Sequence, residues 1–356
     1  MPSTCRKFLT STLATLPAAL GLTHRVASSA DKPVRRMGLV IHSFPVHVAA
    51  SKSRGDRLPF ADPFRFLDHA NELGAAGIQV GIGSLDATER TRLRDRLAAT
   101  GMFLEGMVRL PKDRDDVARF DQELGAAKDC GVTILRTVCL NGRRYETFDS
   151  AEAFREFKQQ AWQSLTLAEP VAAKHGVRLA VENHKDWRVD ELLDILKRLD
   201  SRHVGVNLDT GNSIALLEDP HAVVEAFTPW AITTHFKDMA VAEYADGFLL
   251  AEVPLGRGFL DLKRIVATLR QANPAIRINL EMITRDPLKV PCLMPKFWAT
   301  FDSLAARHLA DALACVKRHA PDRPLPEISR LPIDRQLEIE TTNVRESLKF
   351  ADELLG

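Results

Sequence analysis

Four polar residues, which end short β-rich runs in the second half of the chain, combine three carboxylates with one imidazole: Glu182, Asp209, His235 and Glu281. The first two intervals are 27 and 26 residues, each about one strand-helix unit, and the third, of 46 residues, includes a long loop. Gathered at one point, the three carboxylates would repel one another, and a divalent cation relieves that repulsion. Oxygen donors with one imidazole and no thiolate favour Mn²⁺, Mg²⁺ or Co²⁺ over a structural zinc site. We therefore expect one divalent ion, with Mn²⁺ preferred.

The runs that place these residues alternate with helix-periodic segments from residue 37 onward. Eight such runs are expected as strands: Met37–His42, Ile78–Val80, Phe103–Val108, Thr133–Thr137, Arg178–Glu182, Val204–Leu208, Ile232–Phe236 and Arg277–Glu281. Strands that alternate with helices pair in parallel through right-handed crossovers. Eight units favour a closed barrel over an open sheet, so we predict an α/β chain with a (β/α)8 TIM barrel over residues 31–320.

Three connections are too long to be simple turns: Ser43–Asp62, Asp238–Leu260 and Thr284–Thr300. Each follows the C-terminal end of an expected strand, which is the face where barrels of this kind carry their active sites. Long connections at that face usually act as lids or binding walls. The four polar residues lie at the same face, because the carboxyl ends of neighbouring strands converge on the barrel mouth.

Both ends of the chain lie outside the expected barrel. Arg6 and Lys7 precede an apolar run from Phe8 to Leu22, and small residues follow as far as Ala30. This pattern is typical of an export signal over residues 1–30, and predicts a periplasmic location, or a cytoplasmic one if the leader is not functional. No other stretch is long and apolar enough for stable membrane insertion. Residues 321–356 read as a proline-rich linker and an accessory helix, a C-terminal helical extension that packs on the barrel or on a second subunit of a homo-oligomer.

The overall charge gives no electrostatic reason to expect a nucleic-acid partner. Lys and Arg total 48 against 47 Asp and Glu, and the formal net charge is +1, whereas nucleic-acid binding usually shows a basic excess. The five cysteines form no short metal-binding pair. We therefore expect buried thiols rather than a disulfide framework.

Over roughly residues 37–320 the sequence resembles the xylose-isomerase-like TIM-barrel superfamily, also called the sugar phosphate isomerase/epimerase family. The resemblance depends on five motifs: Val181–His184, Asp209–Asn212, His235–Asp238, Pro254–Asp261 and Leu280–Glu281. It implies that the four residues named above bind the metal. It also implies that Glu182 and Glu281 act as base and acid on opposite faces of a sugar substrate.

The implied reaction is isomerisation or epimerisation of a small carbohydrate through an enediolate. A metal bound to the carbonyl and hydroxyl oxygens stabilises the enediolate that forms when the neighbouring carbon loses a proton. Two carboxylates can then remove the proton on one face and return it on the other. The alternative is a lyase (a dehydratase, decarboxylase or keto-glycoside eliminase) that acts on a keto-sugar or sugar acid. A barrel that only binds sugar is a third reading, which the intact glutamates disfavour.

Five neighbouring residues are candidates for substrate contact: His184, Asn212, Lys237, Arg257 and His42. For His184, Lys237 and Arg257 the alternative is an ordinary structural or solvated side chain. Trp187 and Trp298 are equally compatible with pocket walls and with core packing. Family members often carry a histidine three residues after the aspartate ligand, where this chain has Asn212. Its absence argues against the DNA-repair branch of the superfamily.

Overall fold

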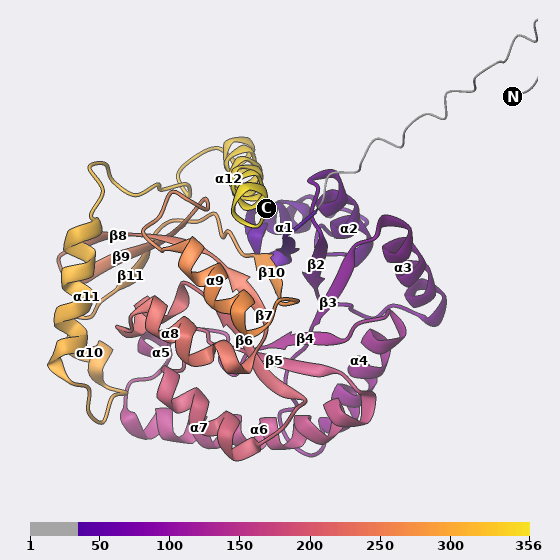
Figure 1. Ribbon diagram of the computed structural model, residues 1–356, viewed down its shortest axis with the longest axis horizontal. Helices are drawn as coiled ribbons and strands as arrows, with labels where there is room; N and C mark the ends of the chain where they lie inside the picture. Colours follow the sequence, from indigo (N-terminus) through magenta and orange to yellow (C-terminus); the bar gives the residue numbers. More distant parts are fainter. Residues whose placement is uncertain (1–34) are drawn as a thin grey trace, which may run out of the picture. The chain divides into compact units, whose positions relative to one another are not determined.

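Eight parallel strands close into a barrel in the computed structural model, which describes residues 35–356 (Figure 1). The barrel order is β1-β10-β7-β6-β5-β4-β3-β2. The strands are β1 (Gly38–Val40), β2 (Gly77–Val80), β3 (Phe103–Met107), β4 (Ile134–Thr137), β5 (Arg178–Glu182), β6 (Val204–Asp209), β7 (Ala231–Phe236) and β10 (Arg277–Leu280). The predicted (β/α)8 TIM barrel is confirmed. The first strand is shorter than expected, because residues 41–43 turn into a 3-10 helix.

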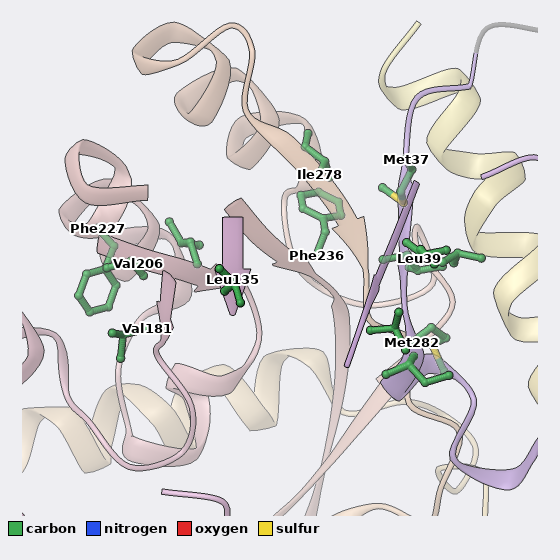
Figure 2. Packing of buried hydrophobic residues seen from close by; sticks show 14 of the residues in the cluster. Met37, Leu39, Leu135, Val181, Val206, Phe227, Phe236, Ile278 and Met282 are labelled. Carbon is green, nitrogen blue, oxygen red and sulfur yellow. The ribbon is translucent and has the colours of Figure 1, made fainter. Parts of the chain in front are cut away.

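Helices surround the barrel and cover the outward faces of its strands. They are α2 (Pro63–Glu72), α3 (Ala87–Thr100), α4 (Val117–Asp129), α6 (Ala151–His175), α7 (Val189–Leu199), α8 (Pro220–Phe227), α9 (Leu262–Ala272) and α11 (Ala306–His319). Figure 2 shows part of the apolar layer between strands and helices, where Val206 of β6 and Phe227 of α8 belong to one buried cluster. Burial of each such side chain stabilises the fold by roughly 1.5–3 kcal/mol.

Local signals set the helix boundaries. Asp219 and Asp261 accept hydrogen bonds from backbone N–H groups in the first turns of α8 and α9, as is typical of N-cap aspartates. Gly176 ends α6 with a φ of 62°, a left-handed conformation that glycine adopts without strain.

The three long connections are structured. The first contains α1 (Pro45–Arg54), and the second folds into a hairpin of β8 (Asp238–Tyr244) and β9 (Gly247–Val253). The third adds β11 (Leu288–Val290) to the edge of this hairpin and then forms α10 (Pro295–Trp298). A small antiparallel sheet thus stands beside the barrel mouth, and its strand β9 brings Glu252 near the four polar residues, where its Oε1 lies 3.8 Å from Lys237 Nζ.

The C-terminal helix α12 (Ile333–Leu354) packs against α1 (Figure 1). Its buried residue Glu340 accepts hydrogen bonds from the backbone N–H groups of Val46 (2.7 Å) and His47 (3.0 Å) in the first turn of α1. The residue at the N-cap of α1 is Phe44, which has no side-chain acceptor, so Glu340 supplies the cap from a distant helix. The expected accessory helix therefore packs on the barrel.

Two further expectations concern the ends and the thiols. The expected export signal, residues 1–30, lies outside the described residues. Within residues 35–356, no helix combines the length and the apolar character needed to cross a bilayer. Four cysteines of the same part of the chain are free thiols: Cys130, Cys139, Cys292 and Cys315.

Candidate metal centre

Neighbouring strands bring the four expected ligands together. Glu182 and Asp209 end β5 and β6, His235 lies in β7, and Glu281 follows β10 directly. These strands are consecutive in the barrel, with Asp209 opposite His235 in the β6–β7 register. One ligand atom from each residue lies within 4.8 Å of the others, and all four residues are buried. The predicted cluster therefore exists as a compact group at the barrel mouth.

Two buried atoms of the cluster have no hydrogen-bond partner, and they fit a metal ion. Asp209 Oδ1 accepts from the N–H groups of Gly211 and Asn212, but its Oδ2 and the Nδ1 of His235 make no hydrogen bond. His235 Nδ1 lies 3.3 Å from Glu182 Oε2 and 3.2 Å from Glu281 Oε1. Unsatisfied buried donors and acceptors are rare in folded proteins. Three carboxylate oxygens and one imidazole nitrogen facing one point match the donor set of a divalent cation.

Two residues that the sequence analysis missed hold the imidazole. Gln79 Oε1 lies 2.6 Å from His235 Nε2, and Gln79 Nε2 donates to Glu105 Oε2 at 3.0 Å. Glu105 also accepts hydrogen bonds from Thr233 and Asn279, so three donors hold its carboxyl group in place. The available signal was a polar residue inside each of two otherwise apolar strands, β2 and β3.

Lys237 neutralises the carboxylates from within the cluster. Its Nζ lies 2.9 Å from Asp209 Oδ2 and 2.6 Å from Glu281 Oε2, and the side chain is 2% exposed. Burial opposes the charged form, but the nearby Asp209 and Glu281 raise the pKa of Lys237 above its usual value. Lys237, which was predicted to contact substrate, therefore lies among the four metal ligands.

Glu182 is held on both oxygens. Arg136 of β4 is a third residue that the sequence did not single out. Its Nε donates a hydrogen bond to Glu182 Oε2 at 2.7 Å. Asn212 Nδ2 donates to the other oxygen at 3.1 Å. Although burial opposes ionisation, Arg136 and His235 hold the pKa of Glu182 well below its usual range. A carboxylate in this setting binds cations well and accepts a proton poorly.

Glu281 differs because it contacts a residue that reaches open space. His42 Nδ1 lies 2.9 Å from Glu281 Oε1, and the His42 side chain is 39% exposed. Although burial opposes ionisation, His235 and Lys237 hold the pKa of Glu281 well below its usual range. The His42–Glu281 pair therefore links the buried cluster to the surface.

A cavity of about 1130 Å³ opens beside this pair. His42 and Arg136 line it, together with segments that follow β2, β3 and β4 and with parts of α4 and α6. Each of these two residues also contacts a carboxylate of the cluster. The volume is of the order expected for small-molecule sites, roughly 300–1,000 Å³. A substrate in this cavity would reach the cluster from the β2–β4 side.

The other expected contact residues are placed differently. His184 is half-buried, with Nδ1 3.1 Å from the carbonyl oxygen of Gly142, and desolvation lowers its pKa to about 3, so the ring is neutral. Arg257 is 64% exposed and pairs with Glu346 of α12 at 2.9 Å, so the structure does not bring it to the cluster. The reason is the position of α12, which draws the arginine away from the mouth.

Two tryptophans and one arginine near the site have structural contacts. Trp187 is buried and stacks on Phe157, with ring centroids 5.1 Å apart. Trp298 donates its indole N–H to the carbonyl oxygen of Cys292. Arg144 is buried against Glu191, at 2.7 Å. None of the three lines the large cavity beside the cluster.

Comparisons with known proteins agree with this arrangement. The family model described as xylose isomerase-like TIM barrel matches residues 67–314. A curated relative from Pectobacterium atrosepticum, named 3-oxo-isoapionate decarboxylase, is 28% identical over 210 residues, covering 57% of this chain and 71% of the relative.

Solved structures share the fold. A D-psicose 3-epimerase crystallised in the presence of D-fructose matches with a TM-score of 0.54 and 15% identity, over 80% of this chain and 99% of that one. A xylose isomerase-like TIM barrel protein from Mycobacterium smegmatis, in complex with magnesium, matches with a TM-score of 0.53 and 17% identity, over 79% and 98%.

Proposed function

Since the chain belongs to the xylose isomerase-like TIM barrel family, we propose that it is a metal-dependent enzyme acting on a small keto-sugar derivative. Glu182, Asp209, His235 and Glu281 would hold the ion, and the oxygen-rich donor set favours Mn²⁺, with Mg²⁺ or Co²⁺ as alternatives. A divalent ion there would stabilise the negative charge that develops on substrate oxygens as an enediolate forms. The compact and buried arrangement of these four side chains supports this proposal, as does His235 Nδ1, which makes no hydrogen bond and faces two carboxylates.

We further propose that the reaction is decarboxylation of a keto-sugar acid, and one observation carries this choice. Glu182 has both oxygens engaged by side chains that do not exchange protons near neutral pH, Arg136 and Asn212, whereas Glu281 contacts the imidazole of His42. Epimerisation by two carboxylates needs each of them to exchange a proton with carbon, and Glu182 is poorly suited to that task. The relative named as a decarboxylase also supports the choice.

Loss of carboxylate needs no base at carbon. The bond between the carboxyl carbon and its neighbour breaks, carbon dioxide leaves, and the electron pair passes through the neighbouring carbon to the keto oxygen. One proton donor then completes the reaction at carbon. His42 suits this role, because it is partly exposed, lines the cavity and contacts Glu281.

The second candidate reaction is isomerisation or epimerisation, which the contact between Glu281 and His42 supports. Glu281 with His42 forms a carboxylate-imidazole pair at the cavity, able to take a proton from carbon. The D-psicose 3-epimerase with the same fold makes this candidate reasonable. A dehydratase or keto-glycoside eliminase would share the same first step.

One experiment separates these reactions. The metal-loaded protein is incubated in heavy water with keto-sugar acids and with neutral ketoses, and the products are analysed by mass spectrometry and NMR. Release of carbon dioxide, with one deuterium on the product carbon, is the expected result. Deuterium in a product of unchanged formula, without gas release, would replace decarboxylation by isomerisation or epimerisation. Activity that persists after complete metal removal would reject the metal-dependent mechanism.

A further inference from the structure

We propose that this site selects an anionic carbohydrate over a neutral one, because the acidic and basic side chains in and around the four ligands balance one another and leave the charge of a bound divalent ion uncompensated. This inference rests on the metal-dependent function proposed above and deepens it by naming the charge class of the substrate. Its basis is the set of ionisable side chains that surround the ligands, and one buried lysine in particular, Lys185.

Acids and bases balance in this part of the described chain. The acids are Glu182, Asp209, Glu281 and Glu252, and the bases are Arg136, Lys185, Lys237 and Arg285. Arg285 Nη2 lies 2.5 Å from Glu252 Oε1, and its side chain is 31% exposed, whereas the other three bases are buried. With the imidazole of His235 neutral, as a metal ligand requires, the set has no net charge.

Adding a divalent ion makes this set positive by two charges. Three carboxylates and a divalent ion alone would total one negative charge, which suits a neutral polyol. Here the surrounding bases reverse the sign. Burial of uncompensated charge is costly. A neutral substrate would leave the net positive charge of the metal-loaded site in place, whereas a substrate carboxylate would reduce it. After loss of carbon dioxide the negative charge stays on the substrate, at the former keto oxygen.

Lys185 is the base that most clearly lacks a partner. Its ammonium reaches Asn212 Oδ1, and Lys237 Nζ lies 3.3 Å from the same oxygen. Within residues 35–356 no carboxylate oxygen lies within 4 Å of Lys185, although its side chain is buried. Two ammonium groups that share one neutral acceptor in a buried site are favourable only when an anion lies nearby.

Other buried groups nearby do not alter the balance. Glu105 lies 3.4 Å from Arg277, so this pair adds no net negative charge to the site. Burial raises the pKa of Asp186 to about 8, so this side chain is largely uncharged at pH 7. Burial and the nearby Lys237 lower the pKa of Lys185 only to about 8, and the ammonium form prevails.

The cavity that leads to the site also carries an excess of positive charge. The large cavity is lined by five bases, and among its described lining residues Glu123 is the single acid, which already pairs with Arg119 at 2.8 Å. Arg109 and Lys112 line the same cavity, and neither has a carboxylate partner within 4 Å in the described part of the chain. A basic cleft of this kind raises the local concentration of anions.

Binding of two matched, unreactive probes tests the inference. Glycerate and glycerol differ by a carboxylate in place of a hydroxymethyl group, and neither has a keto group. Isothermal titration of Mg²⁺-loaded protein is expected to give at least tenfold tighter binding of glycerate. Lys185→Met should reduce that preference to threefold or less, with glycerol binding within twofold of the original. Lys174→Met, an exposed lysine paired with Asp121, serves as the matched control and should keep the full preference.

Each outcome bears on a different claim. Equal binding of the two probes, or a preference that survives in Lys185→Met, would overturn the inference. Should Lys185→Met not fold, as judged by circular dichroism, Lys185→Gln and a wild-type series of ethylene glycol, glycolate and oxalate replace it, with affinity expected to rise with charge. Failure of the wild type to retain Mg²⁺ or Mn²⁺ would instead reject the proposed function. A strong preference for glycerate without carbon dioxide release from any keto acid supports the anion selection and rejects decarboxylation alone.

Discussion

Gln79 Oε1 lies 2.6 Å from Nε2 of His235, while Nδ1 of the same ring faces the carboxylates of Glu182 and Glu281. The amide of Gln79 is fixed in this direction because its N–H donates to Glu105. The hydrogen of the neutral imidazole is therefore held on Nε2, and the lone pair on Nδ1 is directed at the cluster. Glu105 and Gln79 thus prepare the histidine for a metal ion from the far side of the ring.

Removal of this support should weaken metal binding. Gln79→Leu takes away the acceptor for Nε2–H, and loss of such a partner typically costs 10- to 100-fold in metal affinity. Competition with a chelator of known affinity measures the change. Gln160→Leu, a cavity-lining residue that hydrogen-bonds to the carbonyl oxygen of Lys112, should stay within about threefold of the wild type. Equal affinities for Gln79→Leu and the wild type would show that Gln79 does not position His235.

Arg136 is expected to be essential for stability in the metal-free protein. Arg136→Met leaves Glu182 buried without its cationic partner, and loss of one member of a buried pair costs about 3–5 kcal/mol. Urea denaturation of the metal-free protein measures the loss. The double variant Arg136→Met with Glu182→Met removes both charges and should recover much of the stability. A double variant as unstable as the single one would mean that packing, and not charge, explains the loss.

Glu281 should be required for turnover. Glu281→Gln keeps the size of the side chain but removes the charge that holds the ion and His42, so the rate should fall at least about a hundredfold. Elemental analysis of the same sample shows how much of the loss reflects metal content. His42→Gln should keep the metal and lose activity in part. Near-normal activity of Glu281→Gln would refute the assigned role.

The metal-free protein should lose stability as the pH rises from about 6.5 to 9. Burial opposes protonation of His235, but Glu281 and Glu182 raise its pKa to about 9. A raised pKa means that the stabilisation is complete below the unfolded value of 6.5 and is lost as the pH passes the folded value. The shift corresponds to a loss on the order of 3 kcal/mol. Urea midpoints at both pH values measure it.

Metal loading should abolish this pH dependence, because the ion requires the neutral ring. His235→Gln, without metal, should also show a smaller change in urea midpoint between the two pH values. A wild-type midpoint that does not change over this range would contradict the proton-linked stabilisation.

Glu340 should stabilise the first helix from a distance. Glu340→Gln keeps one acceptor oxygen but removes the charge and one of the contacts with α1, so we expect a loss of about 1–2 kcal/mol. Thermal unfolding measures the effect. Glu338→Gln on the same helix, where the side chain is exposed and pairs with Arg335, provides the control and should change stability little. Equal effects of the two variants would argue against the cap.

The sequence predicted the barrel and the ligand cluster because both depend on regular spacing. Polar residues at strand ends, such as Glu182 and Asp209, fall at one face in any barrel of this order. Gln79 and Glu105 were missed because a residue inside a strand has partners across the barrel, and Glu105 meets Thr233 at a separation of 128 residues. Arg257 was misjudged for a similar reason, since its partner Glu346 belongs to a helix whose docking site no local pattern indicates.

The contact between Glu340 and the first turn of α1 also bears on how the chain is made. The acceptor lies 293 residues beyond His47, so α1 gains its cap only after Glu340 of α12 has been synthesised. A ribosome-bound chain that has released residue 320 already contains all four metal ligands, yet its first helix is uncapped. The residues of the ion-binding cluster thus precede, in the order of synthesis, the residue that caps α1, the helix that follows the turn containing His42.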